Sequence, residues 1–248
     1  MKGMSLPAIV LTVAVFGVLR VLSPFEAGTT AAGVWPLVLD ALVVMGLGAA
    51  ASAFTAGDPP RRGWIAVTLS QTLIWVGHTL QFLELSYQPV IVVANLMWIV
   101  SILLWVRTFG TFTLAPEWTT RSRIVVGGLS LVAVGTAGAS IYLGLQSDKA
   151  AWDLAYSMAS AVADAAVFIG AVLLVRLLLP MSGGAIARPY LLLCISAAVY
   201  LALDLSMIVT GIGSFAAFEG GLLKLAAIAD GTSFAAGVAQ AVLLRARD

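Results

Sequence analysis

Residues 155–180 read AYSMASAVADAAVFIGAVLLVRLLLP, and this run decides the fold class of the chain. Asp164 and Arg176 are its only charged residues, and the run is longer than the roughly 20 apolar residues that a helix needs to cross a bilayer. The whole chain has the same character, because 61% of its 248 residues are hydrophobic and 10% are charged. With a mean hydropathy of +1.04, this composition is typical of an integral membrane protein.

Seven further apolar runs have similar lengths. The eight predicted spans cover residues 5–24, 34–56, 63–86, 89–110, 123–145, 152–179, 189–212 and 216–244. Short connections with turn residues, such as GDPPRRG at 57–63 and PMSGGAIARP at 180–189, separate them. We therefore predict an all-α, polytopic helix bundle that forms a single transmembrane domain over residues 1–248. The first run resembles a signal peptide in outline, but SPFEAG lacks a small-x-small cleavage site, so we expect a retained span.

Basic residues predict the orientation of the bundle. If the N-terminus is cytoplasmic, ten of the 13 Lys and Arg residues fall on the cytoplasmic side: Lys2, Arg61, Arg62, Arg107, Arg121, Arg123, Arg176, Arg188, Arg245 and Arg247. Only Arg20, Lys149 and Lys224 fall on the outer side. Because loops rich in Lys and Arg stay in the cytoplasm, we expect a multi-pass protein of the inner (plasma) membrane with both termini cytoplasmic.

A short motif occurs twice in the chain. DALVVMG (40–46) and DAAVFIG (164–170) share the pattern D-A-x-V-x-x-G and lie 124 residues apart. His78 in the third span and Asp204 in the seventh are 126 residues apart. These offsets predict two four-helix halves, about 1–120 and 121–248. An even number of helices in each half would relate the halves by an axis along the membrane normal.

Ionisable and amide side chains inside the predicted spans are the candidate site residues. A charge at mid-depth costs at least about 2.5–3.5 kcal/mol on insertion scales, so each such group should face the bundle interior and have a partner. The predicted ligand-binding set is Asp40, His78, Gln81, Asn95, Asp164, Asp204, Lys224 and Asp230. Most of these residues fall in the outer halves of their spans. This one-sided placement predicts a polar pocket that opens outward.

The sequence leaves two roles open for this set. Lys224 and Asp230 are six residues apart, on different sides of their helix, so we expect Lys224 to meet Asp204 or Asp40 instead. Such a pair either fixes the helix register or forms part of a ligand or ion site. Alternatively, Lys224 extends to the outer interface. His78 is either a proton-responsive or ligand-contacting group or a hydrogen-bonded histidine within the bundle.

Several classes of function lack support in the sequence. We find no motif of a hydrolase, metalloprotease or phosphate-binding loop, and we predict no catalytic and no metal-binding residues. The net charge of +1 gives no reason to expect a nucleic-acid partner. A lysine in the last span invites comparison with retinal proteins, but Lys224 lies too near the outer end and eight spans is one too many. Retinal on Lys224 is therefore disfavoured, and the sequence identifies no cofactor.

The second half of the chain resembles a known class of membrane module. The runs AYSMASAVADAAVFIGAVLLVRLLLP, RPYLLLCISAAVYLALDLSMIVTGIG and GGLLKLAAIADGTSFAAGVAQAVLLRAR, over about residues 150–248, are similar to the multi-helix sensor modules found ahead of bacterial diguanylate cyclases and histidine kinases. In those modules an aspartate recurs in successive spans, and the last helix leads into a cytoplasmic output domain. Here the chain stops at LLRARD, so the resemblance implies signal transduction through a partner protein.

These observations lead to one functional hypothesis and two alternatives. We expect a non-enzymatic membrane receptor, sensor or accessory subunit, surrounded by membrane lipids and read by a signalling partner at the cytoplasmic face or in the membrane. A small proton-coupled transporter is the first alternative, because acids at mid-depth and a repeated half are typical of such carriers. A lipid-modifying membrane enzyme is the second. The sequence does not identify the ligand, the partner or the oligomeric state.

Overall fold

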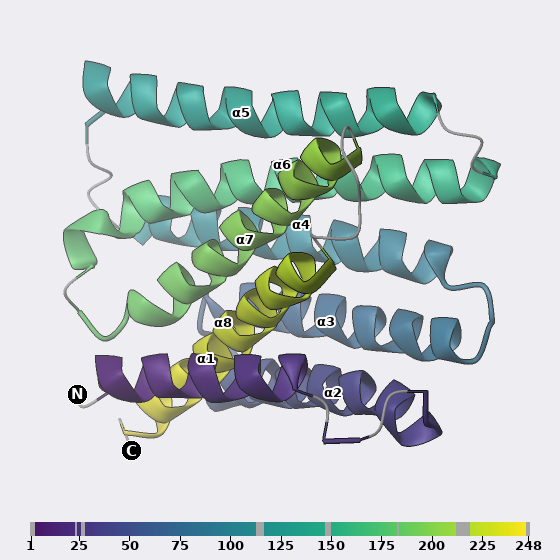
Figure 1. The fold of residues 1–248 in the computed structure, drawn as a ribbon. Helices are drawn as coiled ribbons and strands as arrows, with labels where there is room; N and C mark the ends of the chain where they lie inside the picture. Colours follow the sequence, from purple (N-terminus) through teal and green to yellow (C-terminus); the bar gives the residue numbers. More distant parts are fainter. Residues whose placement is uncertain are drawn as a thin grey trace.

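The protein forms a bundle of long helices in the computed structural model, which describes residues 3–22, 24–25, 28–112, 117–146, 150–182, 184–211 and 219–246 (Figure 1). These residues contain α1 (Leu6–Val21), α2 (Thr30–Ala53), α3 (Arg61–Phe82), α4 (Gln88–Phe112), α5 (Thr120–Leu145), α6 (Ala151–Leu178), the short 3-10 helix η1 (Leu179–Met181), α7 (Arg188–Gly211) and α8 (Glu219–Arg245). The eight long helices occupy the eight predicted segments, and their ends differ from the predicted ends by at most four residues.

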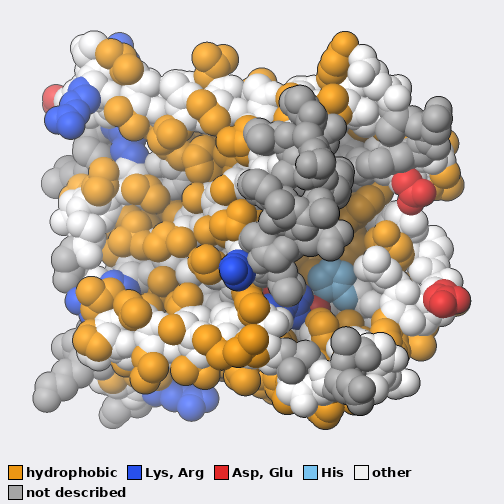
Figure 2. All heavy atoms as spheres, viewed as in Figure 1, with side chains coloured by type: hydrophobic (Ala, Val, Ile, Leu, Met, Phe, Trp, Pro, Cys, Tyr) orange, Lys and Arg blue, Asp and Glu red, His pale blue; other side chains and the backbone are white. Residues whose placement is uncertain are grey.

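Six of the helices in the described part of the chain, α2 and α4 to α8, are long and apolar enough to cross a membrane. Helix α1 is apolar but has only 16 residues, and α3 is less apolar because it carries polar side chains such as Gln71 and His78. Hydrophobic side chains cover much of the lateral surface in Figure 2. The structure thus agrees with a helical membrane protein.

The two ends of the bundle differ in charge. Helix α1 begins and helix α8 ends at one end of the bundle, which we call the terminal end, and the α3–α4 connection lies at the other, which we call the opposite end (Figure 1). Most of the Lys and Arg side chains visible in Figure 2 lie towards the terminal end, whereas most of the visible Asp and Glu side chains lie towards the opposite end.

The helices pack in a pattern that recurs along the chain. Helix α3 packs on α4, as α7 packs on α8; α2 packs on α3, as α6 packs on α7; and α2 packs on α8, as α6 packs on α4. Helices α1 and α5 do not follow the pattern, because α1 lies against α8 while α5 lies against α6 and α7.

Small residues allow the closest of these approaches. A Cβ atom on Gly237 of α8 would collide with the backbone of Gly46 on α2, so the two helices touch through their main chains. On α6, a Cβ atom at Gly170 would lie 2.8 Å from the side chain of Ile102 on α4. Lipid offers no hydrophobic drive for helix association, so close backbone contact of this kind is a main source of packing energy in a membrane.

An aromatic cluster fills the core towards the terminal end. Trp64, Trp105 and Tyr190 are at most 2% exposed, and the rings pack edge to face with centroids 5.4–5.6 Å apart. The indole N–H of Trp64 donates a hydrogen bond to the hydroxyl of Tyr190 at 3.1 Å. This cluster joins α3, α4 and α7 in the core.

Candidate functional site

An arginine lies inside the bundle and holds two aspartates from helices far apart in sequence. Arg20 is in the last turn of α1, and its side chain is 13% exposed. Its Nη1 lies 3.0 Å from Oδ1 of Asp40 on α2, and its Nε lies 3.3 Å from Oδ2 of Asp230 on α8. The two carboxylate side chains are only 2% and 8% exposed. One guanidinium group therefore ties α1 to both α2 and α8.

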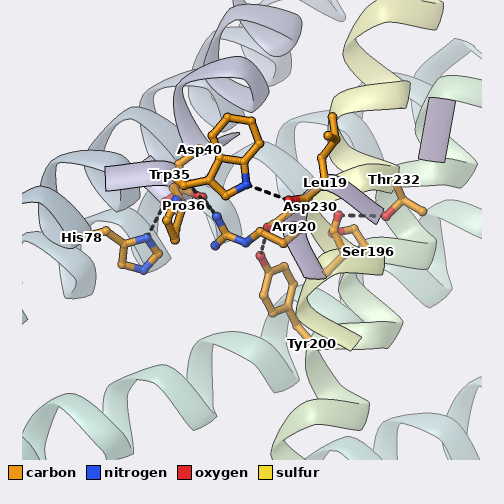
Figure 3. Close-up of polar contacts among 11 residues, drawn as sticks. Leu19, Arg20, Trp35, Pro36, Asp40, His78, Ser196, Tyr200, Asp230 and Thr232 are labelled. Atoms are coloured by element: carbon orange, nitrogen blue, oxygen red, sulfur yellow. Dashed lines mark hydrogen bonds and ion pairs between the residues drawn. The ribbon is translucent and has the colours of Figure 1, made fainter. Parts of the chain in front are cut away.

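Two more side chains extend this cluster, as Figure 3 shows. The Nδ1 atom of His78 on α3 lies 2.8 Å from Oδ2 of Asp40, and the hydroxyl of Tyr200 on α7 donates a hydrogen bond to Oδ1 of Asp230 at 3.1 Å. We call the five residues Arg20, Asp40, His78, Tyr200 and Asp230 the Arg20 network. It connects α1, α2, α3, α7 and α8.

The backbone fixes the position of the arginine. Nη1 of Arg20 also donates to the carbonyl oxygen of Pro36 at 2.9 Å, and the indole N–H of Trp35 donates to the carbonyl of Leu19 at 2.8 Å. These bonds hold the end of α1 against the first turns of α2 (Figure 3). A planar guanidinium with several fixed donors suits a buried pair of carboxylates better than a lysine ammonium does.

A cavity of about 550 Å³ lies beside the Arg20 network, between α2 to α4 and α5 to α8. Its walls are mostly apolar, and Trp98 of α4 contributes one of them. The polar side chains that line it include Gln71, His78, Asn95, Asp164, Tyr200 and Asp204. No lysine or arginine of the described residues lines it. The lining runs from the middle of the helices to Ile91 and Gly144, near the opposite end of the bundle.

Two carboxyl groups face each other in this cavity. Asp164 of α6 and Asp204 of α7 both line the cavity and interact electrostatically with each other. Two carboxylates this close repel each other unless one of them holds a proton. The Asp164–Asp204 pair is therefore a place that can accept or release a proton.

The cavity and the Arg20 network share two residues. His78 and Tyr200 line the cavity, and each also contacts one of the carboxylates that bind Arg20. His78 is the more accessible of the two, with a side chain that is 39% exposed, and it also borders a shallow depression with Arg20 and Gln81. A molecule in the cavity thus contacts the side chains that complete the ion network.

The structure brings most of the predicted site residues into these two groups. Asp40, His78 and Asp230 belong to the Arg20 network, and Asp164 and Asp204 belong to the cavity. Asn95 also lines the cavity, and its Nδ2 donates to the hydroxyl of Ser160 at 2.9 Å. Gln81 does not line the cavity; it is exposed and borders the depression beside His78.

Lys224 differs from our expectation. We expected it to meet Asp204 or Asp40, with an outward-facing side chain as the alternative. Its side chain is exposed and makes no ion pair within the described part of the chain, as in that alternative. Arg20 occupies the place beside Asp40 instead. The physical reason is that Arg20 ends α1 next to α8, so it reaches the interior, whereas Lys224 lies on an outward face of α8.

Sequence reasoning missed Arg20, Tyr200 and Gln71 as members of the site. Arg20 follows an apolar run at its outer end, where an arginine is commonly an interfacial residue. The signal that could have found it is the charge of its neighbours, because two buried aspartates in apolar helices require a cation. Tyr200 and Gln71 carry no motif, and only the packing of α3 and α7 places them at the cavity.

In the described ranges, no group of three or more His, Cys, Asp or Glu side chains is arranged to hold a metal ion. Comparison with known proteins finds no match to a family model, to a curated protein or to a solved structure. The cavity and the Arg20 network are thus the features of the chain that bear on its function.

Proposed function

We propose that this chain is a non-enzymatic receptor or sensor of the inner (plasma) membrane, which binds a small molecule in the cavity and signals through a partner at the cytoplasmic face. One observation carries the proposal: His78 and Tyr200 line the cavity and also contact the two aspartates that hold Arg20. Occupancy of the cavity is thereby linked to the contacts that join α1, α2 and α8.

The proposed membrane arrangement has eight spans, with the terminal end in the cytoplasm. The excess of Lys and Arg towards that end supports this orientation, because basic residues are retained on the cytoplasmic side (Figure 2). At 1.5 Å per residue the 16 residues of α1 extend about 24 Å, which is short of a hydrocarbon core of about 30 Å. Its contact with α8 and the burial of Arg20 compensate for that short length.

The proposed arrangement also contains two related halves. The recurring helix contacts support it, since α2, α3 and α4 meet their neighbours as α6, α7 and α8 do. The repeated motif fits this relation: Gly46 at its end in α2 meets Phe234 of α8, and Gly170 at its end in α6 meets Ile102 of α4. The cavity then lies where the two halves meet, which is the usual position of a binding site in a duplicated membrane bundle.

Signalling in this scheme is a shift between two packings of the helices. A ligand that rearranges the hydroxyl of Tyr200 or the imidazole of His78 alters how firmly Asp230 and Asp40 hold Arg20. Helix α1 begins and helix α8 ends at the terminal end, so a change in their contact is presented to a cytoplasmic partner. A ligand has this effect only if it binds one packing more tightly than the other. The resemblance of residues 150–248 to bacterial sensor modules supports the same scheme.

Accessibility from each side of the membrane tests this proposal. We would replace Cys194 by Ser, introduce Ser157→Cys in the cavity lining, and add a charged, membrane-impermeant thiol reagent to right-side-out and inside-out vesicles. The receptor proposal predicts reaction only in right-side-out vesicles. Ser182→Cys, at an exposed position at the terminal end, is the matched control and should react only in inside-out vesicles. Reaction of Ser157→Cys only from the inside would contradict the proposal.

A proton-coupled transporter is the second candidate, and the Asp164–Asp204 pair favours it. Carriers commonly use buried carboxyl groups that exchange a proton, and they place them between two repeated halves. A carrier must expose its cavity to each side in turn. Reaction of Ser157→Cys from both sides, together with uptake driven by a pH gradient in proteoliposomes, would support the transporter instead of the receptor.

A further inference from the structure

We infer that the cavity binds a small organic cation, with an ammonium group at the Asp164–Asp204 pair and an apolar body against the opposite wall. This inference rests on the proposed function and names the class of molecule that the receptor would take. Four features of the cavity lead to it: its charge, an amide without a partner, its walls and its volume.

The charge of the cavity favours a cation. Asp164 and Asp204 lie in its lining, and no lysine or arginine of the described residues faces them there. The one basic side chain of the lining, His78, directs Nδ1 to Asp40 in the Arg20 network. An anionic ligand would meet two carboxyl groups without a compensating charge, and burial of an unpaired charge is costly.

Gln71 is an independent sign of a ligand. The residue is 9% exposed and lines the cavity, and its side chain makes no hydrogen bond to any residue that the structure describes. The amide atoms of Gln71 are not among the fully buried atoms that lack a partner, so they are accessible from the cavity and open to a bound molecule. The amide oxygen can accept a hydrogen bond from a ligand that carries N–H donors.

The walls and the volume define the rest of the ligand. Trp98, Tyr156 and Tyr200 line the cavity, and an ammonium group is attracted to the face of an aromatic ring. Aliphatic side chains such as Ile74 and Leu203 supply apolar surface. A volume of about 550 Å³ is typical of a site for a small molecule.

Binding of the cation exchanges one positive charge for another. The ammonium group donates N–H bonds to Asp164 and Asp204, and the proton that the pair held leaves to water at the opposite end of the bundle. The titratable groups that share the cavity with the pair are His78, Tyr156 and Tyr200. The O–H bond of the protonated carboxyl group breaks and its proton passes to water. No other covalent bond is made or broken, and the charge within the cavity stays the same.

The test uses three compounds of similar size and the full chain in lipid nanodiscs. Calorimetry would measure the binding of 2-phenylethylammonium, the neutral 2-phenylethanol and the anionic 3-phenylpropanoate. We expect the ammonium compound to bind roughly 10- to 100-fold more tightly than the alcohol, as a charge-assisted hydrogen bond requires. We expect no binding of the carboxylate. Titrations in buffers of different ionisation enthalpy should show release of one proton for each cation bound.

Variants of the two cavity aspartates provide a second test of the cation-binding inference. Asp164→Asn and Asp204→Asn should each lower the affinity for the ammonium compound and leave that for the alcohol nearly unchanged. Glu84→Gln, an exposed acid outside the cavity lining, is the matched control and should change neither affinity. The comparison of the three compounds needs no variant, so it holds even if an aspartate substitution prevents folding.

The outcomes separate this inference from the proposed function. Equal affinity for the ammonium compound and the alcohol, or tighter binding of the carboxylate, would contradict the inference that the ligand is a cation. The proposal that the chain is a receptor for a small molecule would still stand. Absence of ammonium binding at millimolar concentration would overturn it as well. The proposed function fails separately, through reaction of Ser157→Cys from the cytoplasmic side alone.

Discussion

Arg20 and Asp230 are near opposite ends of the chain, yet Nε of the guanidinium and Oδ2 of the carboxylate are only 3.3 Å apart within the bundle. Because Asp40 holds the same guanidinium at 3.0 Å, the first helix is joined to the second and the last by one side chain. This arrangement explains how a short helix such as α1 keeps its place. It also connects five polar side chains from five helices in one network.

Replacement of the arginine should destabilise the protein strongly. Arg20→Met leaves two buried carboxylates without a cation, and removal of one partner from a buried ion pair costs about 3–5 kcal/mol. Unfolding in mixed micelles, followed by circular dichroism, would measure the loss. Lys224→Met is the matched control, because Lys224 is exposed, and should change the free energy of unfolding by less than about 0.5 kcal/mol. Equal effects of the two substitutions would contradict the network.

Replacement of Asp40 and Asp230 should restore part of the stability that Arg20→Met loses. The triple variant with Arg20→Met, Asp40→Asn and Asp230→Asn contains no unpaired charge in the network, so it should be more stable than Arg20→Met alone. The same unfolding assay would compare the two. If the triple variant were less stable than Arg20→Met, Arg20 would not act through these two aspartates.

The Tyr200 hydroxyl should contribute through Asp230. Tyr200→Phe removes one hydrogen bond to a buried carboxylate, with an expected cost of about 1–3 kcal/mol. A double-mutant cycle with Asp230→Asn should show a coupling energy of at least about 0.5 kcal/mol. Tyr142→Phe, on the exposed face of α5, is the control. A coupling energy near zero would show that the two side chains act independently.

Helix contacts should depend on single glycines. Gly237→Ala places a methyl group against the backbone of Gly46, and overpacking of this kind costs about 1–3 kcal/mol. Gly128→Ala on α5 meets nothing within 4 Å, so we expect it to be neutral or to stabilise the helix by up to about 1 kcal/mol. Thermal unfolding of both variants would check the difference in sign. A stabilised Gly237→Ala variant would show that α2 and α8 do not touch there.

Much of the helix pattern could be predicted from the sequence, because apolar runs of sufficient length alternate with short, polar, proline- or glycine-containing connections. The observed helix ends differ from the predicted ends where local hydrogen bonds or backbone angles determine them. Helix α2 begins at Thr30 instead of residue 34, because the hydroxyl of Thr29 accepts a hydrogen bond from the N–H of Ala32. Helix α3 ends at Phe82 instead of residue 86, because Glu84 has a φ of +57° and interrupts the helix.

The candidate site could be predicted only in part. Charges in apolar helices identify Asp40, Asp164 and Asp230 directly, since such groups must turn inward. Their partners depend on which helices are neighbours, and the sequence does not contain that information. Arg20 and Lys224 look alike as basic residues near the ends of apolar runs, yet one is buried and the other exposed. A cavity is the space that packing leaves, so neither Gln71 nor Trp98 could be assigned to it in advance.

The central claim is that the cavity and the Arg20 network act together through Tyr200. Spin labels on Cys substitutions at Ser182 and Arg245, two exposed positions at the terminal end, would report the distance between the α6–α7 connection and the end of α8 in nanodiscs, with Cys194 replaced by Ser. We predict that saturating 2-phenylethylammonium shifts this distance when Tyr200 is present, and that Tyr200→Phe abolishes the shift without abolishing binding. An unchanged distance with the compound bound, or the same shift in Tyr200→Phe, would contradict the account.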